Sequence, residues 1–129
     1  MNVSRWTLAV ALLVLALPTS LMALTIPSRC LIVGKWSMWG KDKNYSFVHH
    51  LQFKSNGEMI GEDETIIDGK KTVHHVQGTW RIEGKTLTII SREQGRETIE
   101  AVDFKIYGKQ LELSDKNDSV VFQRVNDAP

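Results

Sequence analysis

The chain has a single cysteine, Cys30, and this excludes an internal disulfide. Cys30 stands just before the first predicted strand, where the sequence is compatible with an intermolecular disulfide or with a reduced, half-buried thiol. A lipoprotein cysteine normally follows a small uncharged residue. Arg29 occupies that position, so lipid attachment is the disfavoured third interpretation.

The sequence also lacks an excess of one charge. Arg5 is the only charged residue of positions 1–23, so the rest of the chain holds 15 of the 16 basic residues against all 15 acidic ones. This balance excludes the basic surface that nucleic-acid binding requires. Acidic and basic residues alternate along the predicted strands, which is typical of a solvated outer barrel face.

Signatures of the common enzyme classes are missing as well. The sequence has no nucleophile elbow, phosphate-binding glycine loop, His-Glu-x-x-His motif or cysteine-histidine signature. The acidic run from Glu62 to Glu64 is most simply a solvated strand edge. The sequence therefore predicts a binding protein and no enzymatic activity.

Residues 1–23 have the layout of a secretory signal. Arg5 precedes an apolar run, and a polar turn with Pro18 follows it. We expect cleavage after Ala23 and an exported domain at 24–129, either periplasmic or secreted. A retained membrane anchor is the alternative, because the apolar stretch is long enough to cross a thin bilayer.

Turn signals recur so regularly that each intervening segment has the length of a β-strand, about 6 to 11 residues. The signals are Asn56-Gly57, Asp68-Gly69, Glu83-Gly84, Gln94-Gly95, Gly108-Lys109 and Lys116-Asn117-Asp118. The predicted strands cover residues 31–39, 45–53, 58–67, 72–82, a segment around 86–89, 96–107, 110–114 and 119–125. No helix fits between the turns.

Eight such strands predict an all-β fold, an antiparallel up-and-down β-barrel with an interior wide enough for side chains or one small ligand. Two stacked antiparallel sheets are the alternative. Closure also removes exposed strand edges. The alternation is less clean at Ala101-Val102, which indicates a bulge or the bend of a barrel corner.

Four pieces of the sequence occur in an order typical of one known family. They are Gly34-Lys35-Trp36, Leu51-Gln52-Phe53-Lys54-Ser55-Asn56-Gly57, Gly78-Thr79-Trp80-Arg81-Ile82 through Leu87-Thr88-Ile89, and Arg124. In this order they resemble the Gly-x-Trp opening, the following strand and turn, the central hairpin and the closing-strand arginine of bacterial lipocalin-like domains. The resemblance spans nearly all of 31–125 and implies a small exported barrel that binds a ligand.

Three of these residues have structural roles on physical grounds alone. Gly34 lets its strand bend sharply or lets another backbone approach closely. Trp36 plugs one end of the barrel with its indole. Arg124 stacks over that indole and hydrogen bonds to terminal carbonyls.

The four histidines form two doublets, His49-His50 and His74-His75, and a strand sends one ring of each doublet inward. If Phe53 pairs with Met59, His49 lies opposite Asp63, and the next hairpin brings His74 beside Thr65. His49, Asp63 and His74 are thus candidate ligands for zinc or another divalent ion. A hydrogen-bonded polar patch and solvent-facing rings are the alternatives.

The leading prediction is a non-enzymatic barrel that binds a small, partly apolar ligand and needs no cofactor. The candidate ligand-binding residues are Leu51, Phe53, Val76, Trp80 and Phe104. One alternative is a periplasmic interaction or inhibitor protein that uses its outer face and loops. The other is a metal-binding protein. A cavity of several hundred Å³ favours the carrier, and a filled core favours the partner-binding protein.

Overall fold

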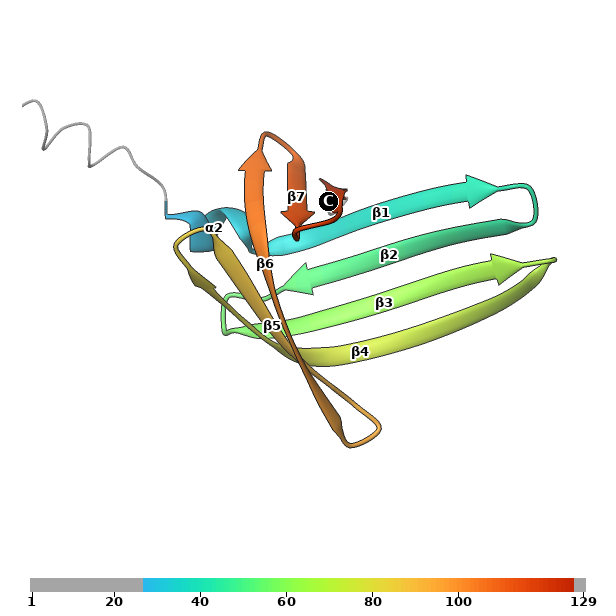
Figure 1. Ribbon diagram of the computed structural model, residues 1–129, viewed down its shortest axis with the longest axis horizontal. Helices are drawn as coiled ribbons and strands as arrows, with labels where there is room; N and C mark the ends of the chain where they lie inside the picture. The colour runs from blue at the N-terminus through green and yellow to red at the C-terminus, as the bar shows by residue number, and fades with distance from the viewer. Residues whose placement is uncertain (1–26, 127–129) are drawn as a thin grey trace, which may run out of the picture.

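The computed structural model describes residues 27–126, which form a closed antiparallel β-barrel of eight strands (Figure 1). Each strand pairs with the next along the chain, and the last pairs with the first. The all-β, up-and-down prediction is confirmed. The predicted signal segment 1–23 lies outside the described residues.

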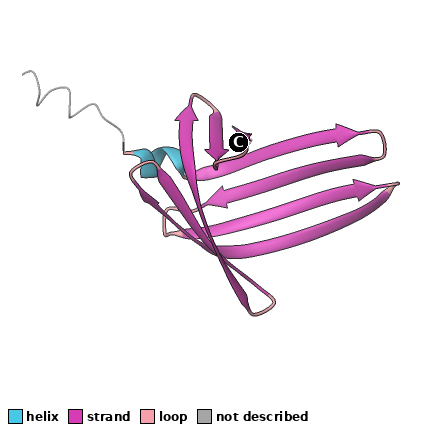
Figure 2. Cartoon of the chain, viewed as in Figure 1, coloured by secondary structure: helices cyan, strands magenta, loops and turns pink. Residues whose placement is uncertain are grey.

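Apart from one short helix, the elements of residues 27–126 are all strands (Figure 2). They are α2 (Ser28–Ile32), β1 (Gly34–Asp42), β2 (Tyr45–Phe53), β3 (Glu58–Ile67), β4 (Lys70–Glu83), β5 (Thr86–Glu93), β6 (Arg96–Tyr107), β7 (Gln110–Ser114) and β8 (Ser119–Arg124). Between residues 27 and 126 no helix is both long and apolar enough to span a membrane.

The predicted turns form where the glycines stand. Gly57, Gly69, Gly84, Gly95 and Gly108 all have positive φ, a conformation that glycine adopts without a steric penalty. Because these turns are short, each fixes the register of its hairpin. Tyr45 to Phe53, for example, faces Ile67 to Met59 without a break.

The predicted start of the first strand at Leu31 is wrong. Leu31 and Ile32 belong to the helix α2, and β1 begins at Gly34. The helix lets the carbonyl oxygen of Ile32 accept a hydrogen bond from Trp36 Nε1 at 2.8 Å. Ile32 itself is fully buried. A single helical turn therefore covers one end of the barrel, and periodicity over so few residues could not reveal it.

The alternation along β6 predicts a bulge or a bend at Ala101-Val102. The register of this strand with β5 runs unbroken through Ala101 and Val102, so β6 contains no bulge there. Asp103 pairs with Thr86 of β5 and also with Ser114 of β7. The strand thus leaves one neighbour and joins the other at this residue.

The core lies at the end of the barrel that α2 covers. Its buried residues come from α2 and from seven of the strands: Ile32, Trp36, Phe53, Met59, Trp80, Leu87, Leu111 and Phe122. Phe53 and Trp80 meet edge to face with ring centroids 5.6 Å apart. Trp80 Nε1 donates to the carbonyl oxygen of Lys54 at 2.9 Å, so its polar atom is satisfied.

Gly34, Trp36 and Arg124 meet at this same end. The Arg124 guanidinium lies 4.1 Å from the Trp36 ring centroid, and it donates to the carbonyl oxygens of Leu31 and Val33. Gly34 has φ +136°, and a Cβ there would lie 2.7 Å from Arg124 Nη1. The backbone angle favours glycine, and a Cβ would also push the Arg124 guanidinium from its position.

Candidate functional site

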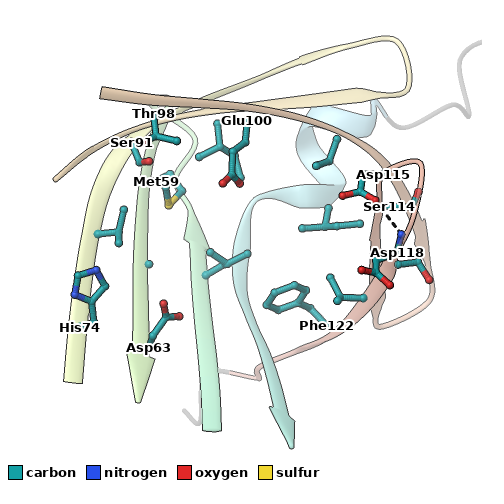
Figure 3. Close-up of a pocket in the computed structure, with 18 of the residues that line it drawn as sticks. Met59, Asp63, His74, Ser91, Thr98, Glu100, Ser114, Asp115, Asp118 and Phe122 are labelled. Atoms are coloured by element: carbon teal, nitrogen blue, oxygen red, sulfur yellow. Dashed lines mark hydrogen bonds between the residues drawn. The ribbon is translucent and has the colours of Figure 1, made fainter. Parts of the chain in front are cut away.

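A cavity of about 530 Å³ opens at the end of the barrel opposite α2 (Figure 3). Its deeper wall is apolar and its mouth is polar. The apolar side chains are Leu51, Met59, Val76, Ile89, Val102, Leu113, Val120 and Phe122. This volume lies within the range of small-molecule sites, which is about 300 to 1,000 Å³.

The cavity exists because small residues take inward positions where the core would otherwise continue. Gly61 lies between Leu51 and Val76 on the inner face. Ser91 and Thr98 take inward positions in the neighbouring row, which runs through Met59 and Gly78. Such side chains do not reach across the barrel. The interior is therefore filled beside α2 and open near the other end.

The five predicted ligand-binding residues divide into two groups. Leu51 and Val76 line the cavity. Phe53 and Trp80 are buried in the core beneath it, and Phe104 packs against that core without lining the cavity. The alternation along each strand predicted their inward direction correctly, but it could not indicate their depth along the barrel.

Five carboxylates surround the mouth. They are Asp63, Glu93, Glu100, Asp115 and Asp118. The one basic group among the described lining residues is the imidazole of His74. The cavity therefore combines an apolar interior with an acidic opening.

Asp115 closes the turn between β7 and β8. Its Oδ1 accepts hydrogen bonds from the backbone N–H groups of Asn117 at 2.8 Å and Asp118 at 2.9 Å. These bonds favour the ionised carboxylate and lower the pKa of Asp115 below its ordinary value of 3.8. The turn thus holds a negative charge at the mouth.

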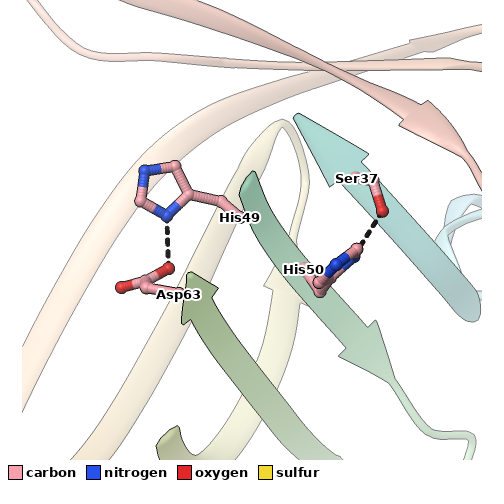
Figure 4. Close-up of polar contacts among 4 residues, drawn as sticks. All are labelled: Ser37, His49, His50 and Asp63. Atoms are coloured by element: carbon pink, nitrogen blue, oxygen red, sulfur yellow. Dashed lines mark hydrogen bonds and ion pairs between the residues drawn. The ribbon is translucent and has the colours of Figure 1, made fainter. Parts of the chain in front are cut away.

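The His49-His50 doublet sends its two rings to opposite faces of the sheet (Figure 4). His49 hydrogen bonds through Nδ1 to Asp63 on the inner face, and His50 Nδ1 lies 2.6 Å from the hydroxyl of Ser37 on the outer face. His74 lines the cavity and pairs through Nε2 with Glu93.

The register differs by two residues from the one expected for His74. His74 lies opposite Asp63, and Thr72 takes the place beside Thr65. The Asp68-Gly69 turn is tighter than the predicted loop, so β4 begins at Lys70 and moves each partner along. His49, Asp63 and His74 consequently share one row across three strands.

The side chains of this row are bonded in two separate pairs. His49 bonds to Asp63 within the row, and His74 bonds to Glu93 of β5 outside it. Across residues 27–126 no group of three or more His, Cys, Asp and Glu side chains is arranged to hold a metal ion. Zinc binding by His49, Asp63 and His74 stays a prediction. A rise of the unfolding temperature on titration with zinc would support it.

Of the five carboxylates at the mouth, the sequence singled out only Asp63 as a candidate site residue. Glu100 shares the inward alternation of Val102 and Phe104, so period two already placed a carboxylate in the interior. Glu93 follows Ser91 in the same way. Asp115 and Asp118 lie outside the strands, and no periodicity applies to them.

Comparison with protein-family models, with curated proteins and with solved structures gives no significant match.

Proposed function

We propose that this chain is an exported, lipocalin-like carrier that binds one small, partly apolar ligand inside its barrel and catalyses no reaction. The observation that carries this proposal is the cavity of about 530 Å³ above a packed core. A barrel that works only through its outer face has no need of an open interior. The apolar wall supplies the area that a ligand would bury.

The route into the cavity supports the same function. At one end, α2 and the core side chains Trp36 and Phe53 fill the barrel. At the other end the first halves of β4 and β6 are exposed, and the turn between β7 and β8 contributes Asp115 and Asp118 to the mouth. A ligand would enter there, with its apolar part toward Leu51 and Val76.

Export and bacterial origin belong to the proposal too. They rest on the layout of residues 1–23 and on the order of Gly34-Lys35-Trp36, the central hairpin and Arg124. The stacking of Arg124 on Trp36, expected on physical grounds apart from the resemblance, joins two of these pieces.

A cavity-filling variant tests the function. N-phenyl-1-naphthylamine is a neutral dye that becomes fluorescent in apolar surroundings, and we expect it to bind the wild-type protein saturably at one site. Val102→Trp fills the cavity from β6 and should abolish that binding. Val73→Trp is the matched control, because Val73 is 43% exposed and lies outside the cavity.

The proposal fails if the wild-type protein shows no saturable site for the dye. It also fails if Val102→Trp, with an unfolding transition as cooperative as that of Val73→Trp, binds the dye as tightly as the wild type. If the dye binds as expected, native mass spectrometry of protein recovered from its own host would identify the natural ligand.

A further inference from the structure

We propose that the cavity selects ligands whose polar end is a cation with N–H donors, that is, amphiphilic amines. This inference rests on the proposed function and adds the chemical class of the ligand. Its basis is the set of carboxylates that line the cavity: within residues 27–126, some of them are bonded to neighbouring groups and two are not.

The charges at the cavity are nearly all of one sign. Its described lining contains five carboxylates and one imidazole, and no lysine or arginine. The chain outside residues 1–23 holds as many basic as acidic residues, so this lining departs from the composition of the whole. The basic residues lie on other surfaces, for example Lys54 and Arg92 in a groove on the outer face.

Three of the five carboxylates already have partners. Asp63 is bonded to His49, Glu93 is paired with His74, and Asp115 accepts the two turn amides. Within the described residues the carboxylates of Glu100 and Asp118 have no hydrogen bond or ion pair. Two acceptors therefore remain for a ligand.

Glu100 is the better placed of the two. It lies on β6 next to Thr98 and Val102 on the inner face, and its carboxylate points into the cavity (Figure 3). Ile89 pairs with Glu100 across the β5–β6 ladder, and Val102 is the next inward residue along β6. A ligand with its apolar part on this wall would hold its polar end at Glu100.

The negative charges of Glu100 and Asp118, both exposed at the mouth, decide the sign of that polar end. An ammonium group that leaves water gains a charge-assisted hydrogen bond to Glu100, and Asp118 adds a second negative charge at the mouth. A carboxylate or phosphate in the same place loses its hydration among like charges. A neutral hydroxyl gains one ordinary hydrogen bond. We therefore expect affinity to fall from cation to neutral group to anion.

Three probes with one tail separate these cases: octylamine, 1-octanol and octanoate, each titrated by isothermal calorimetry at pH 7 and low salt. We expect octylamine to bind roughly tenfold more tightly than 1-octanol, the factor for one charge-assisted hydrogen bond, and octanoate to bind most weakly. Added salt should reduce the preference for the amine, because the mouth is open to solvent.

The decisive variant is Glu100→Gln, which keeps the shape of the side chain and removes its charge. It should lower the affinity for octylamine by about tenfold and leave that for 1-octanol unchanged. Glu97→Gln is the matched control: it lies three positions away on β6, has the same change of net charge, and pairs with Arg92 away from the cavity. It should leave both affinities unchanged.

The outcomes separate the two proposals. If none of the three probes binds, the carrier function itself fails. If 1-octanol binds and octanoate binds as tightly as octylamine, the carrier stands and selection for cations is overturned. Equal losses of octylamine affinity in Glu100→Gln and Glu97→Gln would also overturn it, because the preference would then reflect net charge and not this site.

Discussion

The guanidinium of Arg124 stacks on the indole of Trp36, with 4.1 Å between the guanidinium carbon and the ring centroid, and so ties the last strand to the first. The same guanidinium donates to the carbonyl oxygens of Leu31 and Val33 on either side of Ile32. The last strand is thereby fastened to α2 and to the start of β1 at the closed end of the barrel.

Trp36→Ala should lower the free energy of unfolding by about 3 to 5 kcal/mol, because it empties a fully buried indole site and leaves the Ile32 carbonyl without its donor. Urea denaturation measures the loss. Trp39→Ala is the control on the same strand, since Trp39 is 65% exposed, and it should change stability by less than about 1 kcal/mol. Similar losses in the two variants would contradict the role of Trp36 as a plug.

Arg124→Lys should cost about 1 to 3 kcal/mol although the charge is kept. Lysine cannot reach both carbonyl oxygens while it stacks flat on an indole. Arg92→Lys serves as control, because Arg92 forms only an exposed ion pair with Glu97. Thermal unfolding of the two variants should differ clearly, and equal unfolding temperatures would reject the clamp.

Gly78→Ala should destabilise the barrel by more than about 2 kcal/mol, because the added Cβ would lie 2.0 Å from the carbonyl oxygen of Ile90, a backbone atom that cannot move aside freely. At Gly61 the nearest atom would be 3.6 Å away, an ordinary contact. Gly61→Ala should therefore keep the wild-type unfolding midpoint within about 1 kcal/mol. If both variants are tolerated, β4 and β5 are not in the close approach described.

Asp115→Asn should remove a pH-dependent part of the stability. The folded pKa of Asp115 is lowered by two backbone hydrogen bonds, so its contribution is present above the ordinary value of 3.8 and disappears as the pH falls through the folded value. The variant should be less stable than wild type at pH 7 and equal to it in strong acid. Urea midpoints at both pH values check this, with Asp103→Asn on β6 as control. A gap that persists in acid would contradict it.

The sequence was a good guide wherever a local rule decides the structure. Glycine turns fixed the hairpins, so β2, β3, β6 and β7 begin and end where expected. The helical turn α2 was missed, because it is held by Arg124 and Trp36 and not by its own propensity.

The candidate site was predicted in part for a similar reason. Period two gave the inward direction of Leu51, Val76 and Glu100. It did not give the position of a side chain along the barrel axis. The core residues Phe53 and Trp80 were therefore predicted to bind the ligand together with the cavity-lining residues. The row of His49, Asp63 and His74 depended on the length of one loop, and a shift of two residues changed their neighbours.

The short helix at the closed end has a practical consequence. Cys30 is exposed on α2, and it is the single thiol of the chain. A fluorophore or a sensor surface coupled there would be attached at the far side from the acidic mouth. The molecule can thus be immobilised in one orientation, with its entrance facing the sample.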